Sequence, residues 1–197
     1  MDINFKAGQV INFKNRGFFS KTIAMGLGNY WTHTGWIHTV KGDKILIQEA
    51  LGSKTKKVTI NEYSRQTLVE KFEKGELKIM DFGIKPNEKF YTYAVIIDGL
   101  PYDYYAILEL AVARLLTLFG INPSKFLEFS VFNRVRMKLN PYFTTKKKVD
   151  CSEAISRGIA KLTMIDVIAE LKVDKFEQVT PQLVSVLYDR LKTLGKL

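Results

Sequence analysis

The chain contains one cysteine, Cys151, and this residue lies at a predicted helix start. Asp150 and Glu153 flank it with the spacing of a capping box, in which an acidic cap precedes a Glu by three residues. In the first turn of a helix, unpaired backbone N–H groups and the positive end of the dipole favour a thiolate. The position therefore predicts a nucleophile. The alternative is that Cys151 packs as a small hydrophobic residue.

A thiol nucleophile needs an imidazole partner, and the chain has only two histidines, His33 and His38. Both belong to a segment rich in aromatic, Thr and β-branched residues, which predicts a strand. Because side chains alternate across a strand, His33 shares a face with Trp31 and Gly35, and His38 lies on the other face. The two cannot serve one site. His33 is the candidate base or a structural histidine, and His38 is expected to be solvated.

Glu49 is the candidate for the third polar group, which fixes the tautomer of the base. If residues 41–43 form a three-residue loop, Gly35 pairs with Glu49, and Glu49 lies diagonal to His33 on the same face. Gly35 then leaves room for the contact. A two-residue turn at 42–43 would reverse the parity and send Glu49 to the other face, as an exposed strand carboxylate.

The first half of the chain predicts strands, because short apolar or alternating segments are separated by turn-forming residues. These are Gln9–Phe13, Trp31–Val40, Lys44–Ala50, Val58–Ile60 and Leu77–Asp81, and residues 89–97 form a strand or a helix. The second half predicts helices with start and stop signals, at Tyr104–Phe119, Ser124–Leu139, Asp150–Leu162 and Thr180–Leu194. The fold class is therefore α+β, with a small antiparallel sheet or partial barrel packed against helices.

No signal peptide is evident in the first ten residues, which lack an apolar run. The most apolar segment, 104–119, is interrupted by Glu109 and Arg114 and is shorter than the roughly 20 residues that span a bilayer. It is therefore expected to be a buried helix. The expected location is the cytoplasm, and a viral or phage origin stays open.

The composition predicts one domain over residues 1–197, since the chain shows no repeat and no linker. Its net charge of +10 favours polyanions such as anionic polymers or a membrane surface, without a pattern specific for nucleic acid. A single cysteine excludes an internal disulfide. One Cys and two His without CxxC or HxxxH spacing are too few for a zinc site, so no metal or cofactor is expected.

Three segments together resemble the circularly permuted NlpC-type papain-like hydrolases, most closely the YiiX-like and poxviral branch. They are Trp31–Ile37, Ile47–Ala50 and Val149–Ile155. In that family the histidine strand precedes the nucleophile helix, and a polar residue on the next strand completes a triad. Further similar segments are Ala7–Ile11, where an acidic residue commonly replaces Gln9, Tyr102–Tyr104 and Thr180–Leu183. The hydrophobic helical insert at 104–139 departs from the family.

The resemblance implies a permuted papain-like fold in which Cys151 is the nucleophile, His33 the general base and Glu49 the orienting residue. Cys151 would attack an acyl carbonyl and form a thioester, while backbone N–H groups at the helix start stabilise the oxyanion. Residues expected to contact the substrate are Trp31, Gly35, Tyr102 and Ser152.

Three functions follow from these observations. The first is a cysteine hydrolase, a peptidase or amidase, acting on a peptide or other amide. The second is a lipid-directed thiol acyltransferase or esterase, as in the related lecithin retinol acyltransferase-like proteins, which the hydrophobic insert favours. The third is a non-catalytic basic module that binds polyanions, with Cys151 inert.

Overall fold

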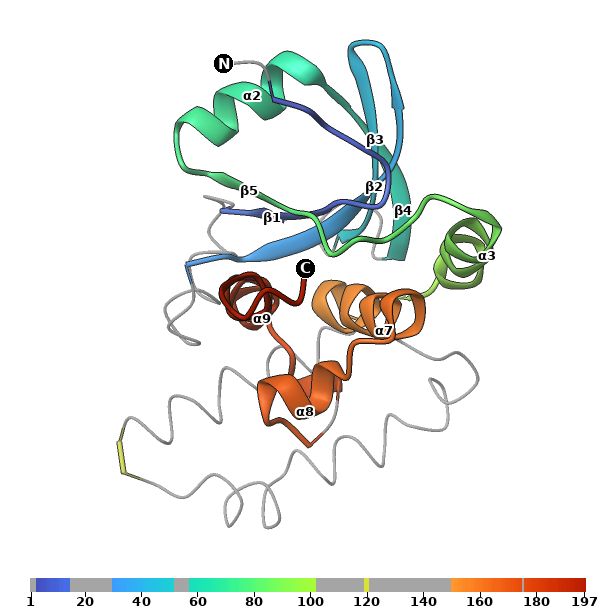
Figure 1. Cartoon of the computed structure of the whole chain (residues 1–197). Coiled ribbons are helices and arrows are strands. Elements are labelled where there is room, and N and C mark those ends of the chain that lie inside the picture. The colour runs from blue at the N-terminus through green and yellow to red at the C-terminus, as the bar shows by residue number, and fades with distance from the viewer. Residues whose placement is uncertain (1–2, 15–29, 52–56, 102–118, 121–149, 175) are drawn as a thin grey trace.

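Five antiparallel strands form one open sheet in the computed structural model, which describes residues 3–14, 30–51, 57–101, 119–120, 150–174 and 176–197 (Figure 1). The strands are β1 (Val10–Phe13), β2 (His33–Lys41), β3 (Lys44–Leu51), β4 (Lys57–Ser64) and β5 (Leu77–Met80). Their order across the sheet is β4-β3-β2-β1-β5. The predicted α+β class with an antiparallel sheet is confirmed.

Helices cover both faces of the sheet. On one side lie α3 (Glu88–Ile97), α7 (Cys151–Thr163), α8 (Val167–Leu171), the 3-10 turn η2 (Phe176–Gln178) and α9 (Pro181–Thr193) (Figure 1). On the other side lies α2 (Arg65–Glu73). The alternation of β1 divides its side chains between two cores, with Val10 in the first and Ile11 and Phe13 in the second.

Local signals in the sequence account for most helix starts. Asp150 caps α7 by accepting the backbone N–H of Glu153, and Thr180 caps α9 by accepting that of Leu183. Both caps confirm the predicted starts, and Pro181 takes the first helical position, where its missing N–H costs nothing.

The segment of undecided type, 89–97, is helical. Phe90, Tyr93, Ala94 and Ile97 are buried, and this spacing places them on one helical face. Asn87 caps the helix by accepting from the N–H of Phe90. Two further helices, α2 and α8, were not predicted. Leu68 of α2 is buried, with Val69 and Phe72 partly buried against the same core, so the apolar stripe of this helix is short.

The predicted helices at 104–119 and 124–139 fall outside the described residues, apart from Phe119. The same applies to most of the predicted hydrophobic insert.

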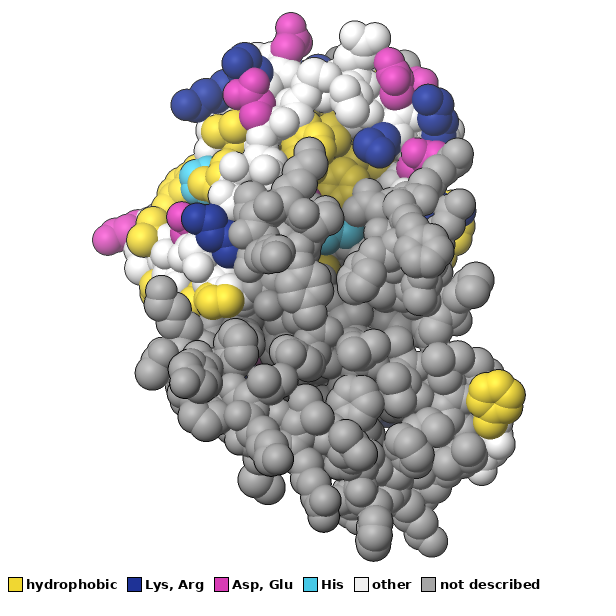
Figure 2. Space-filling view, turned by 180° about the vertical axis from the view of Figure 1, so that it is seen from behind, with side chains coloured by type: hydrophobic (Ala, Val, Ile, Leu, Met, Phe, Trp, Pro, Cys, Tyr) yellow, Lys and Arg dark blue, Asp and Glu magenta, His cyan; other side chains and the backbone are white. Residues whose placement is uncertain are grey.

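Charged side chains are spread over the described part of the face in Figure 2. There, Lys and Arg side chains lie among Asp and Glu side chains and do not gather into one basic patch. Lys44 and Glu62 form an exposed ion pair, with Nζ and Oε1 2.9 Å apart. Exposed pairs of this kind contribute little to stability.

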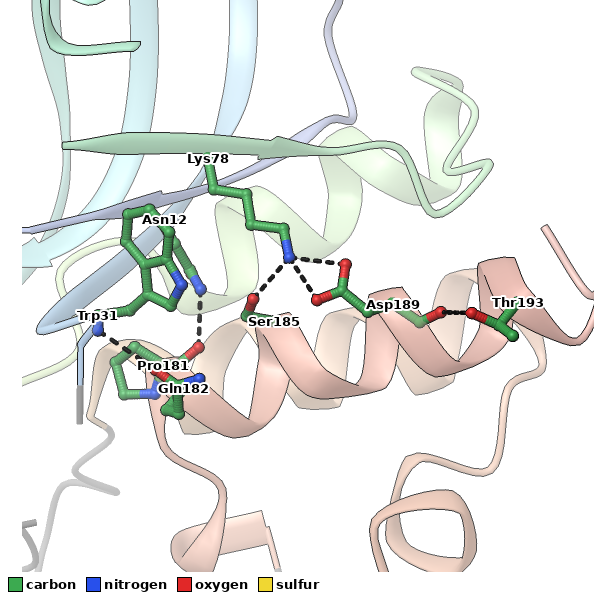
Figure 3. A network of polar contacts seen from close by, with 8 residues as sticks. All are labelled: Asn12, Trp31, Lys78, Pro181, Gln182, Ser185, Asp189 and Thr193. Atoms are coloured by element: carbon green, nitrogen blue, oxygen red, sulfur yellow. Dashed lines mark hydrogen bonds and ion pairs between the residues drawn. The ribbon is translucent and has the colours of Figure 1, made fainter. Parts of the chain in front are cut away.

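Polar contacts attach α9 to the sheet (Figure 3). Lys78 of β5 donates to the hydroxyl of Ser185 and to both carboxylate oxygens of Asp189, each at 2.7 Å. Asn12 of β1 donates through Nδ2 to the carbonyl of Pro181 at 2.7 Å. The side chain of Gln182 accepts from the backbone N–H of Trp31, just before β2 begins. The start of α9 therefore holds the start of β2.

Gly158 lets α7 approach the sheet closely. A Cβ at this position would lie 2.3 Å from Cζ3 of Trp36 and 3.0 Å from Cε1 of Tyr93. The Trp36 ring cannot retreat easily, because its Nε1 donates to Gln48 at 3.0 Å and Phe90 packs beside it. The absence of a side chain at 158 thus sets how near the helix that begins at Cys151 comes to β2.

Gly158→Ala should destabilise the protein by about 1–3 kcal/mol, the usual range for overpacking a filled core. In an unconstrained helix interior the same change stabilises by about 1 kcal/mol, because alanine has the higher helix propensity. Urea unfolding of both proteins measures the free-energy difference. A gain in stability would show that the contact between α7 and Trp36 is loose.

Candidate active site

The hairpin of β2 and β3 sets the position of Glu49. Its turn has two residues, Gly42 with a φ of +57° and Asp43, between the paired Lys41 and Lys44. The turn is therefore the two-residue alternative, and not the three-residue loop from which the pairing of Gly35 with Glu49 was derived. The register nevertheless pairs Gly35 with Glu49, because a β-bulge at position 38 shifts the pairing by one residue.

Without the bulge, this two-residue turn would pair Gly35 with Ala50 and turn Glu49 to the other face. His38 is the residue in excess, and its Nδ1 lies 2.9 Å from the hydroxyl of Thr39. It was expected to be solvated, but it is half-buried, because its ring packs against Phe90 and Tyr91 of α3. Burial lowers the pKa of His38.

His33 and Glu49 form a buried contact. Nε2 of His33 lies 2.6 Å from Oε2 of Glu49, and the two residues are 5% and 2% exposed. Gly35 makes room for this arrangement, since a Cβ there would lie 3.0 Å from Cβ of Glu49 and 2.9 Å from the carbonyl oxygen of Gln48. The predicted proximity of the two side chains is present in the structure.

The second oxygen of Glu49 accepts two more hydrogen bonds, both from β4. The hydroxyl of Tyr63 donates to Oε1 at 2.6 Å, and Nδ2 of Asn61 donates to the same oxygen at 3.1 Å. A buried carboxylate is costly unless its oxygens are bonded, so these donors stabilise its charge.

Asn61 and Tyr63 were missed in the sequence because the predicted strand ended at Ile60. Extending it would have placed Asn61 and Tyr63 on one face by period-two alternation, beside Glu49. This alternation was the available signal.

Cys151 lies beside His33, and the two are the first residues of α7 and β2. Burial alone would lower the pKa of His33, but a hydrogen bond with Cys151 and the thiolate charge, followed by the same two effects of Glu49, raise it to about 10. Since Nε2 faces Glu49, Nδ1 is the ring nitrogen left for Cys151. This arrangement favours the protonated form of the His33 imidazole near neutral pH.

The helix start around Cys151 is buried and polar. Cys151 is 4% exposed, which agrees with the alternative that it packs as a small hydrophobic residue. Its hydrogen bond with the imidazole of His33 agrees with the role of a nucleophile. Asp150 is 2% exposed and accepts from the N–H of Glu153 at 2.7 Å and from the hydroxyl of Ser152 at 2.9 Å. Burial raises the pKa of Asp150 to about 7, against the lowering effect of these hydrogen bonds.

The predicted substrate contacts differ in where they lie. Gly35 is directly opposite Glu49. Ser152 is buried, and its hydroxyl is bonded to Asp150 at the helix cap. Trp31 is half-buried, with its ring edge-on to Tyr30 at a centroid distance of 4.9 Å. Tyr102 lies outside the described residues.

Comparisons with known proteins find a similar solved structure and no similar sequence family. No family model matches the sequence, and no curated protein matches it. The structure is similar to the crystal structure of metalloprotein YiiX, DUF1105, from Escherichia coli O157:H7, with 17% sequence identity and a TM-score of 0.38. The likeness covers 77% of this chain and 91% of that one. At this level it says nothing about the site.

The described residues contain no group of three or more His, Cys, Asp or Glu side chains placed to hold a metal ion. Within the same ranges, every helix falls short of the length and apolar character that crossing a bilayer requires.

Asp150→Asn should gain stability relative to the wild type as the pH rises from about 4 to about 7. Asparagine keeps the capping oxygen, whereas the aspartate must ionise in a buried place. The folded pKa of about 7 is above the ordinary value of 3.8, so the folded wild type holds a proton that the unfolded chain has lost, and its stability falls across this window.

The difference in unfolding free energy between the two proteins should change by at most about 1.4 kcal/mol per pH unit. Urea unfolding at pH 4.5, 6 and 7.5 measures it. A difference that stays constant with pH would mean that the Asp150 carboxyl is not penalised by burial.

Proposed function

We propose that the protein is a cysteine-dependent hydrolase that cleaves an acyl bond, in a peptide or other amide, through Cys151, His33 and Glu49. One observation carries the proposal: a thiol at the start of α7 shares a buried imidazole with a carboxylate held by two further donors. A nucleophile, a base and a group that orients the base are the parts that acyl transfer needs. The resemblance of the three sequence segments to permuted NlpC-type hydrolases agrees with it.

The reaction begins with attack of the Cys151 thiolate on the acyl carbonyl carbon, which forms a C–S bond and an oxyanion. The N–H of Cys151 would stabilise the oxyanion. The Asp150 side chain accepts from the N–H groups of Ser152 and Glu153. His33 then gives its proton to the leaving amine, and the C–N bond breaks. Water, deprotonated by His33, attacks the thioester and releases the acid and the thiolate.

Glu49 acts on His33 alone. It accepts from Nε2, so the ring presents Nδ1 to the thiol and to the leaving group. A carboxylate in this place also stabilises the imidazolium that exists before attack and after hydrolysis.

Alkylation of Cys151 by iodoacetamide between pH 4 and 10 tests the pair without any substrate. A thiolate paired with His33 should react below pH 7, whereas an ordinary thiol with a pKa of about 8.5 reacts tenfold more slowly with each pH unit below that value. His33→Ala should therefore slow the reaction at pH 6 by about tenfold or more.

His38→Ala is the matched control, because it removes the other imidazole, whose ring contacts Thr39, Phe90 and Tyr91, and it keeps the number of residues in β2. If the wild type shows a single titration at the value of a free thiol, Cys151 has no imidazolium partner and the basic binding module becomes the better interpretation.

Turnover is tested with a panel of peptide amides, muropeptides and acyl esters. Cys151→Ala should abolish cleavage of any substrate that the wild type turns over, and the wild type should form a thioester detectable by mass spectrometry after acid quenching. Cleavage of acyl esters but not amides would point to the lipid-directed esterase or acyltransferase, which uses the same residues. Cleavage retained in Cys151→Ala would refute the mechanism.

A further inference from the structure

Two side chains of β4 donate hydrogen bonds to Glu49. Both bonds end on Glu49, and neither involves Cys151 or His33. Tyr63 reaches Oε1 at 2.6 Å, which is as short as the contact of Oε2 with His33. Asn61 adds a longer bond of 3.1 Å. With one oxygen bound by β4, the carboxylate cannot turn its other oxygen away from the imidazole without losing bonds.

Phe13 closes these contacts into a ring. Its aromatic ring stacks on His33 with centroids 5.9 Å apart and planes at 26°, and on Tyr63 at 5.9 Å and 25°. Phe13, His33, Glu49 and Tyr63 come from β1, β2, β3 and β4, one from each of four neighbouring strands. Tyr63 thus contacts two groups that in turn contact the His33 imidazole: the Glu49 carboxylate and the Phe13 ring.

We infer that Tyr63 is a positioning residue for the candidate active site: its hydroxyl fixes Glu49 so that His33 presents Nδ1 to Cys151. The inference rests on the proposed function, and it adds how the orientation of the His33 ring is fixed. Asn61 is the weaker second donor. Burial, together with the charge and hydrogen bond of Glu49, raises the pKa of Tyr63 well above its usual value, so the hydroxyl keeps the proton that it donates.

A structural role is the competing explanation, because any buried carboxylate needs donors. If Tyr63 only satisfied Glu49, removing its hydroxyl would lower stability and leave the reactivity of the thiol unchanged. The two explanations therefore differ in the reactivity of the Cys151 thiol, although the Tyr63 hydroxyl is bonded to Glu49.

Tyr63→Phe removes the hydroxyl and keeps the ring against Phe13. At pH 6 we expect alkylation of Cys151 to slow by about tenfold, the value of one charge-assisted hydrogen bond, with the titration of His33 moved toward the ordinary range in ¹⁵N NMR. The chain has only two histidines, and His38→Ala assigns their signals.

Tyr93→Phe is the matched control. Tyr93 also buries its hydroxyl, but donates it to the carbonyl of Ala154 at 3.0 Å. It should lose stability similarly without changing the signals of His33. Should Tyr63→Phe fold poorly, Asn61→Ala is the second variant, with an expected slowing of about two- to fivefold in the same direction.

The decisive measurement combines Tyr63→Phe with Glu49→Gln. If Tyr63 acts through Glu49, the tyrosine change should slow alkylation in the wild type and have little effect in the glutamine background. Equal slowing in both backgrounds, or no slowing in either, would overturn the inference.

These experiments distinguish a failure of the positioning role from a failure of the proposed function. A wild type that alkylates with a free-thiol profile, insensitive to His33→Ala, contradicts the proposed function and the positioning role together. A wild type that depends on His33 but not on Tyr63 leaves the function standing and removes the positioning role alone.

Discussion

The contact between Nε2 of His33 and Oε2 of Glu49 is the interaction on which the site depends. Both groups are buried, and each would be costly in isolation, so they are stable only together and with further partners. The sheet supplies those partners from both sides, with Phe13 against the imidazole and β4 donors on the carboxylate. A hydrogen bond with Cys151 then completes the set.

The sequence predicted those parts that local rules determine. The caps at Asp150 and Thr180 satisfy N–H groups within three residues, so the starts of α7 and α9 could be located from spacing alone. Alternation in β2 placed His33 and Gly35 on one face. All these features depend on short stretches of chain.

The remaining features depend on contacts between distant segments. The turn at Gly42 is one residue shorter than predicted, and the bulge at His38 that compensates for it is stabilised by α3, which comes some fifty residues later. The length of β4 depends on its pairing with β3 up to Ser64, and the alternation of its own sequence beyond Ile60 does not show where that pairing ends. Close packing at Gly158 likewise requires knowing where Trp36 lies.

The hairpin therefore contains two irregularities whose effects cancel. The two-residue turn alone would pair Gly35 with Ala50, and the bulge shifts the pairing back by one residue, so their combination leaves the imidazole and the carboxylate on the same side. Deleting His38 would remove the bulge and leave Gly35 opposite Glu49, whereas a regular ladder that kept His38 would pair Gly35 with Ala50. The bulge thus accommodates one extra residue in β2, so hairpins that differ by one residue at this position can share one geometry at the imidazole and the carboxylate.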